Sequence, residues 1–155
     1  MIRTYALVNM LYSGLAGFTI DTFEQAIYLD QYTGLGADEI MADGTITPDE
    51  YDTLYTYICT DYGVEDMLDG YWEYGMTITS PCYYVSYSVS ALAVLQLYET
   101  ANTDGFDVAK EQYLKLFTYV DENPEMGMND ILGYAGMLSY KDEQLYVNLN
   151  TYLMK

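Results

Sequence analysis

The stretch "SPCYYVSYSVSALAVLQLY", residues 80–98, decides the fold, because its length and its ends distinguish a helix from a strand. Its first half alternates valine and tyrosine with serine, as a half-buried strand does. The apolar character continues to Tyr98, however, which is farther than an ordinary strand extends. Ser80 is a preferred N-cap residue, and Pro81 suits the first position of a helix. Four serines and Gln96 make the stretch too polar for a membrane span. The sequence therefore predicts a buried helix.

The remaining segments also have helical spacing of apolar residues. Thr47 and Glu50 form a capping-box pattern ahead of a helix that Gly63 ends. The other helices are expected at residues 3–32, 64–70, 107–122 and 129–137 and after Ser139 and Asp142. In the helix at 107–122, the residues expected to face inward are Tyr113, Leu114, Phe117 and Val120. The chain of 155 residues is thus predicted to be all-α, a compact bundle of six or seven helices that forms a single domain over residues 1–155.

The charge balance limits the classes of partner. There are 24 Asp and Glu residues against five Lys and Arg residues, so the surface should repel phosphate backbones and anionic headgroups and favour cationic peptides. We therefore expect no nucleic-acid and no membrane partner. Cys59 and Cys82 match neither a metal-binding spacing nor a disulfide framework. They predict free thiols and a reducing, cytoplasmic location.

Histidine is absent, and this excludes several classes of catalytic site. Ser-His-Asp triads, Cys-His pairs and the His-Glu-x-x-His zinc motif all require an imidazole. The segment "DGTITPDE", residues 43–50, resembles the second half of a calcium-binding EF-hand loop. The first half fails, because Glu39 and Met41 would occupy the first and third positions and a thioether is no calcium ligand. We therefore predict no metal site and no cofactor for this chain.

Three tyrosines at the start of the opening stretch are candidate functional residues. Tyr83 and Tyr84 both have a spacing to Tyr87 that places the side chains on one face of a helix. Tyrosine hydroxyls in such a group can donate hydrogen bonds to a developing oxyanion. The same spacing is typical of packing residues, and this chain contains twenty tyrosines. Spacing alone leaves both interpretations open.

The order of several segments resembles a known family. "GFTIDTFEQAIY", an acidic loop, "ITPDEYDTLY", "SPCYYVSYSVSALAVLQLY" and "NDILGYAGM" together are similar to the C-terminal part of oligoendopeptidase F-like zinc metallopeptidases, relatives of thimet oligopeptidase and neurolysin. The resemblance implies an all-helical fold, and peptide hydrolysis at a zinc ion. It implies that Tyr84 and Tyr87 donate hydrogen bonds near the scissile carbonyl, with Tyr83 as a substrate-binding residue.

This chain departs from the family pattern, because it has no His-Glu-x-x-His motif. Without a Lewis acid, none of its groups activates water for amide hydrolysis. The leading hypothesis is therefore a truncated oligoendopeptidase-like domain that is inactive alone and associates into a homo-oligomer through exposed apolar surface. Two alternatives remain open: a module that binds short peptides, and a half-domain that needs a separate zinc-bearing chain.

Overall fold

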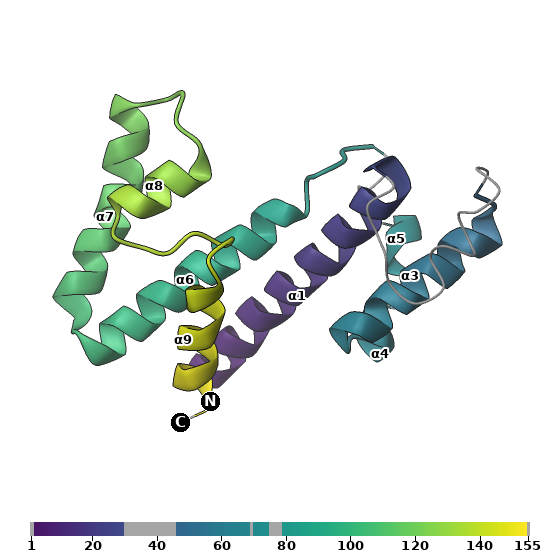
Figure 1. Ribbon diagram of the computed structural model, residues 1–155. Helices are drawn as coiled ribbons and strands as arrows, with labels where there is room; N and C mark the ends of the chain where they lie inside the picture. Colours follow the sequence, from purple (N-terminus) through teal and green to yellow (C-terminus); the bar gives the residue numbers. More distant parts are fainter. Residues whose placement is uncertain (1, 30–45, 69, 75–78, 155) are drawn as a thin grey trace. The chain divides into compact units, whose positions relative to one another are not determined.

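The computed structural model describes residues 2–29, 46–68, 70–74 and 79–154, and the regular structure in these ranges is helical (Figure 1). The all-α prediction is confirmed for this part of the chain, whereas the resemblance to the C-terminal portion of a zincin oligopeptidase stays a prediction. Of the candidate EF-hand loop, residues 39–45 lie outside the described residues and residues 46–50 are described. The helices are α1 (Ile2–Leu29), α3 (Pro48–Tyr62), α4 (Glu65–Leu68), α5 (Tyr71–Tyr74), α6 (Val85–Thr103), α7 (Phe106–Glu122), α8 (Met128–Tyr134) and α9 (Glu143–Leu153).

The chain divides into two compact units, which we call unit 1 (residues 1–88) and unit 2 (residues 89–155). The boundary falls inside α6, so the first turn of this helix belongs to unit 1. The prediction of a single domain over residues 1–155 stays a prediction. Within the described ranges, none of the helices has the length and apolar content that crossing a membrane would require.

Unit 1 is built on α1 and α3, which pack against each other. Phe23 of α1 is fully buried and lies at the centre of the aromatic contacts. Its ring centroid is 5.2 Å from that of Tyr55 and 5.6 Å from that of Trp72, so α1, α3 and α5 meet at this residue. Trp72 also donates a 2.8 Å hydrogen bond from Nε1 to Asp52. The buried core consists of Ile20, Phe23, Ala26, Leu54, Tyr55, Ile58, Cys59 and Val64.

Both ends of α3 agree with the sequence prediction. The backbone N–H of Thr47 donates to Glu50 Oε2 at 2.7 Å, and the backbone N–H of Glu50 donates to Thr47 Oγ1 at 3.4 Å, which completes the capping box. The hydrogen bonds that Glu50 Oε2 accepts from the backbone N–H and the hydroxyl of Thr47 lower the pKa of Glu50. Gly63 ends the helix with φ +66°, a left-handed conformation that glycine adopts without strain. Local signals therefore determine this helix.

The start of α6 differs from the prediction. Ser80 is not the N-cap, and the helix begins at Val85 instead. Cys82 has φ +64°, which breaks the helical path, and its backbone N–H donates to Glu24 Oε2 at 2.6 Å. Pro81 thus lies in a turn that a side chain of α1 holds in place. The helix itself is confirmed, and it extends past Tyr98 to Thr103.

Unit 2 contains most of α6 together with α7, α8 and α9. Gln96 of α6 holds the chain ahead of α9: its Nε2 donates to the carbonyl of Leu138 at 3.1 Å, and its Oε1 accepts from the Leu138 N–H at 2.8 Å. Asp142 caps α9 by accepting from the Gln144 N–H at 2.9 Å. Leu145 and Leu149 of α9 are buried.

Two details of unit 2 correct the prediction. On α7, Tyr113, Leu114 and Phe117 are 49%, 52% and 57% exposed, so they do not face inward. Periodicity identifies the apolar face of a helix, but it does not show whether another element covers that face. The predicted helix at residues 129–137 is α8, which ends at Tyr134; its N-cap is Gly127, and Asn129 Oδ1 accepts from the hydroxyl of Ser139 at 2.7 Å.

Candidate functional site: a tyrosine-lined pocket in unit 1

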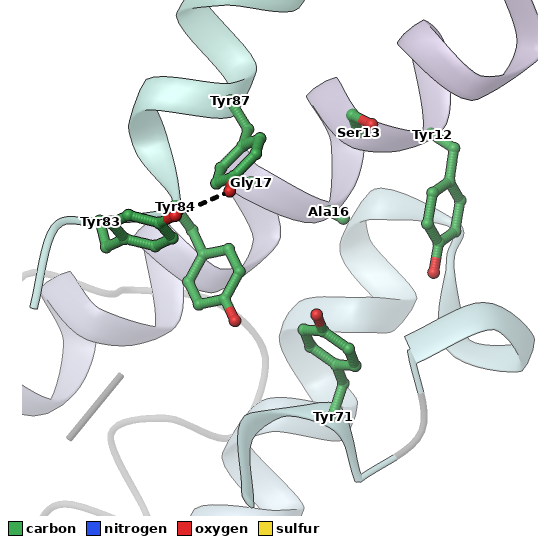
Figure 2. Close-up of a pocket in the computed structure, with 8 residues that line it drawn as sticks. All are labelled: Tyr12, Ser13, Ala16, Gly17, Tyr71, Tyr83, Tyr84 and Tyr87. Carbon is green, nitrogen blue, oxygen red and sulfur yellow. Dashed lines mark hydrogen bonds between the residues drawn. The ribbon is translucent and has the colours of Figure 1, made fainter. Parts of the chain in front are cut away.

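Unit 1 contains a pocket of about 380 Å³ whose walls are mostly tyrosine side chains (Figure 2). One wall comes from α1, one from Tyr71 of α5, and one from the turn before α6 and its first residues. This volume lies at the lower end of the range for small-molecule sites, so it suits one side chain with its adjoining peptide group. The lining residues are Tyr12, Ser13, Ala16, Gly17, Tyr71, Tyr83, Tyr84 and Tyr87.

A close approach of α1 to the start of α6 shapes this pocket. A Cβ atom added at Gly17 would lie 2.6 Å from the backbone oxygen of Tyr84 and would collide with the Ser88 hydroxyl, so the contact requires glycine. Ser88 is fully buried, and its Oγ donates to the carbonyl of Gly14 at 2.8 Å. Gly17 and Ser88 therefore set the position of Tyr84 and Tyr87 against α1.

The turn before α6 is held by a buried carboxylate. Glu24 is 2% exposed and accepts the Cys82 N–H through Oε2, whereas its Oε1 has no hydrogen-bond partner among the described residues. Desolvation raises the pKa of Glu24, the hydrogen bond from Cys82 opposes this shift, and the nearby charge of Asp21 adds to it. Glu24 thus fixes the backbone that carries Tyr83 and Tyr84 into the pocket wall.

The tyrosine rings of the wall meet at steep angles. The planes of Tyr83 and Tyr84 cross at 82°, those of Tyr83 and Tyr87 at 71°, and those of Tyr71 and Tyr84 at 72°, with centroids 5.4 to 6.1 Å apart. Such edge-to-face contacts are favourable, because the positive edge of one ring meets the negative face of the next. Tyr71, Tyr83 and Tyr87 remain 39%, 40% and 46% exposed, so ring surface is still available to a ligand.

The phenol groups of the wall can donate hydrogen bonds. The hydroxyls of Tyr83 and Tyr87 are 2.8 Å apart and share one hydrogen bond, in which either oxygen can donate (Figure 2). This hydrogen bond raises the pKa of Tyr87, and one with Tyr84 raises the pKa of Tyr71. Because two hydroxyls share one hydrogen bond, the Tyr83–Tyr87 pair keeps a second hydrogen for an acceptor. The wall is therefore suited to a carbonyl oxygen.

The structure brings together the three site residues that the sequence predicts. Tyr83, Tyr84 and Tyr87 line one pocket, although Tyr83 and Tyr84 precede α6 and are not on the helix. Their predicted roles as catalytic donors or substrate-binding residues stay predictions. Sequence reasoning missed Tyr12 and Tyr71. Tyr12 lies one turn before Ala16 and close to Gly17, so helical spacing could have predicted that it lies on the same face of α1. Tyr71 lies in a four-residue helix, which is too short to show a periodic pattern.

The described residues contain no group of three or more His, Cys, Asp or Glu side chains that could hold a metal ion. Cys59 is buried and Cys82 is exposed, and neither forms a disulfide within the described part of the chain. The prediction that this chain has no cofactor was made from the sequence and stays a prediction. Comparison of the chain with protein-family models, with curated proteins and with solved structures gave no match.

Proposed function

We propose that this chain is a peptide-binding domain that resembles the C-terminal helical part of oligoendopeptidase F-like metallopeptidases, and that its tyrosine pocket is the binding site. The observation that supports this proposal is the convergence of Tyr83, Tyr84 and Tyr87 on one pocket wall. These are the residues to which the resemblance assigns contacts with the peptide. Phenol donors opposite a cavity sized for one side chain match the needs of a peptide carbonyl and its neighbouring side chain.

On this proposal the chain binds peptides and does not hydrolyse them by itself. Hydrolysis requires a group that takes a proton from water or a metal that lowers the pKa of water. The sequence contains no histidine, and the lining residues are tyrosine, serine, alanine and glycine. The alternative is a half-domain whose zinc comes from a separate chain, and in that case the same tyrosines would contact the substrate.

Calorimetric titration with blocked tripeptides tests the binding proposal. Acetyl-Gly-Leu-Gly-amide should bind the wild-type chain. The double variant Tyr83→Phe/Tyr87→Phe removes both hydroxyls of the pair and should weaken binding about three- to tenfold, because one hydrogen bond contributes about 0.5–1.5 kcal/mol. Tyr113→Phe, which removes the hydroxyl of a half-exposed tyrosine in unit 2, is the matched control and should leave the affinity unchanged. If no blocked peptide binds, or if both variants weaken binding equally, the pocket is not a peptide site.

The predicted homo-oligomer also stays a proposal, and the surface of α7 favours it. Phe106, Leu114 and Phe117 are 73%, 52% and 57% exposed, and large exposed apolar groups promote association. Light scattering should show a mass above that of one chain for the wild type, and Phe117→Ser should lower it. A monomeric wild type would remove this proposal and would leave the peptide-binding proposal untouched.

A further inference from the structure

The tyrosine pocket combines aromatic walls with a strongly negative surrounding chain. Arg3 is the only basic residue among residues 1–88, which contain most of the acidic residues of the protein. The lining residues themselves are uncharged. A ligand in the pocket therefore meets ring faces and hydroxyls directly and experiences the carboxylates only as a longer-range field. A cation gains from both terms, because the ring face is negative and the field attracts positive charge.

The ring geometry suits a flat cation better than a point charge. Tyr84 and Tyr87 are inclined at 33° to each other with centroids 6.1 Å apart, and Tyr83 stands steeply to both of them. Walls in two directions let a ligand contact the face of one ring and the edge or hydroxyl of another. A guanidinium is planar, stacks on aromatic faces and is less strongly hydrated than an ammonium, so it loses less on entering the pocket.

We propose that the pocket recognises the arginine side chain of a peptide, by stacking of the guanidinium on the face of Tyr87 with the edge or hydroxyl of Tyr83 beside it. This inference rests on the proposed function, since it names the side chain that the peptide site prefers. A neutral or acidic side chain would lack the ring attraction, and an acidic one would also be repelled by unit 1. Lysine would profit from the field but would gain less from the rings.

Three blocked tripeptides of the form Gly-X-Gly separate these contributions, with arginine, lysine or citrulline at X. Citrulline keeps the shape of arginine and removes its charge. We expect the arginine peptide to bind most tightly and the citrulline peptide about three- to thirtyfold more weakly, with lysine between them. The preference of arginine over citrulline should persist in part at 0.5 M salt, because a contact within the pocket is screened less than a surface field.

Two variants of Tyr87 distinguish the contribution of its ring from that of its hydroxyl. Tyr87→Phe keeps the aromatic face, so the ratio of arginine to citrulline affinity should survive, whereas Tyr87→Leu should reduce it to near one. Tyr113→Leu in unit 2 is the control and should leave the ratio unchanged. Circular dichroism of each variant shows whether the helices are intact, and Tyr83→Leu provides a second test if Tyr87→Leu does not fold.

The outcomes separate this inference from the function on which it rests. If the arginine and citrulline peptides bind equally, the arginine preference is refuted and peptide binding remains. If the preference disappears in salt and is unaffected by Tyr87→Leu, it comes from the general field alone and the ring contact is refuted. If none of the three peptides binds, the proposed function itself fails.

Discussion

Gly17 is the residue on which the pocket geometry depends most directly, and Gly17→Ala is the sharpest test of that geometry. The added Cβ would lie 2.6 Å from the backbone oxygen of Tyr84, closer than the 3.0 Å below which real Cβ contacts essentially do not occur. A backbone atom cannot rotate away, so α1 and the start of α6 must separate. The separation also displaces the Ser88 hydroxyl from the carbonyl of Gly14, which it reaches at 2.8 Å.

Two opposing effects set the size of the change. Overpacking of a tight contact costs about 1–3 kcal/mol, and alanine in place of glycine within a helix gains up to about 1 kcal/mol. The free energy of unfolding should therefore fall by up to about 3 kcal/mol. Gly133→Ala in α8 is the matched control, because a Cβ atom at Gly133 meets nothing within 4 Å. This control should raise the free energy of unfolding by up to about 1 kcal/mol, from helix propensity alone.

Urea denaturation followed by circular dichroism measures both variants, and peptide titration measures the pocket. Gly17→Ala should be less stable than Gly133→Ala by about 1 kcal/mol or more and should bind peptide more weakly, because Gly17 also lines the pocket. The reasoning would be refuted by a Gly17→Ala variant that is as stable as the control and binds peptide like the wild type. Such a result would mean that α1 and α6 do not approach closely at Gly17.

Three further predictions concern the elements around the pocket. Ser88→Ala removes the buried hydrogen bond to Gly14 and should lower the free energy of unfolding by about 1 kcal/mol, measured by urea denaturation. Thr47→Ala removes the N-cap of α3 and should also cost about 1 kcal/mol; no loss would show that the capping box is unimportant. For Glu24, burial raises the folded-state pKa above the unfolded value, so ionisation opposes folding. The stability of the wild type relative to Glu24→Gln should therefore fall as the pH rises from about 4.5 through the raised pKa, and a difference independent of pH would contradict this.

The fold was predictable where the deciding signals are local. The capping box of Thr47 and Glu50 and the left-handed Gly63 lie within a few residues of the helix ends that they determine, and both ends of α3 were located correctly. The predicted start of α6 was wrong, because the hydrogen bond that determines the real start joins Glu24 to Cys82, 58 residues apart in the sequence. A local cap signal at Ser80 cannot reveal a hydrogen bond from so far along the chain.

The pocket shows the same division between local and distant information. Tyr83, Tyr84 and Tyr87 were identifiable because they lie within five residues of one another, so any compact local conformation brings them together. Tyr71 lies beside these tyrosines because of how α5 packs, and no sequence pattern predicts that packing. The exposed face of α7 was misassigned for a related reason: the pattern around Phe117 shows an apolar face, and only the tertiary structure shows that within the described residues it is left largely uncovered.

Under the proposed function, the pocket binds a peptide and does not by itself catalyse its hydrolysis. Raised pKa values keep Tyr71 and Tyr87 protonated, so they donate hydrogen bonds but do not accept a proton from water at neutral pH. Donors of this kind hold and polarise a carbonyl, and the attack on that carbonyl needs a base or a metal from elsewhere. Adding Zn²⁺ to this chain should therefore produce no cleavage of a fluorogenic peptide that binds it, whereas a zinc-bearing partner chain should restore cleavage if the half-domain hypothesis holds. Cleavage by this chain and Zn²⁺ alone would show that its own side chains assemble a hydrolytic site, and the assignment of the tyrosines as binding groups would have to be replaced.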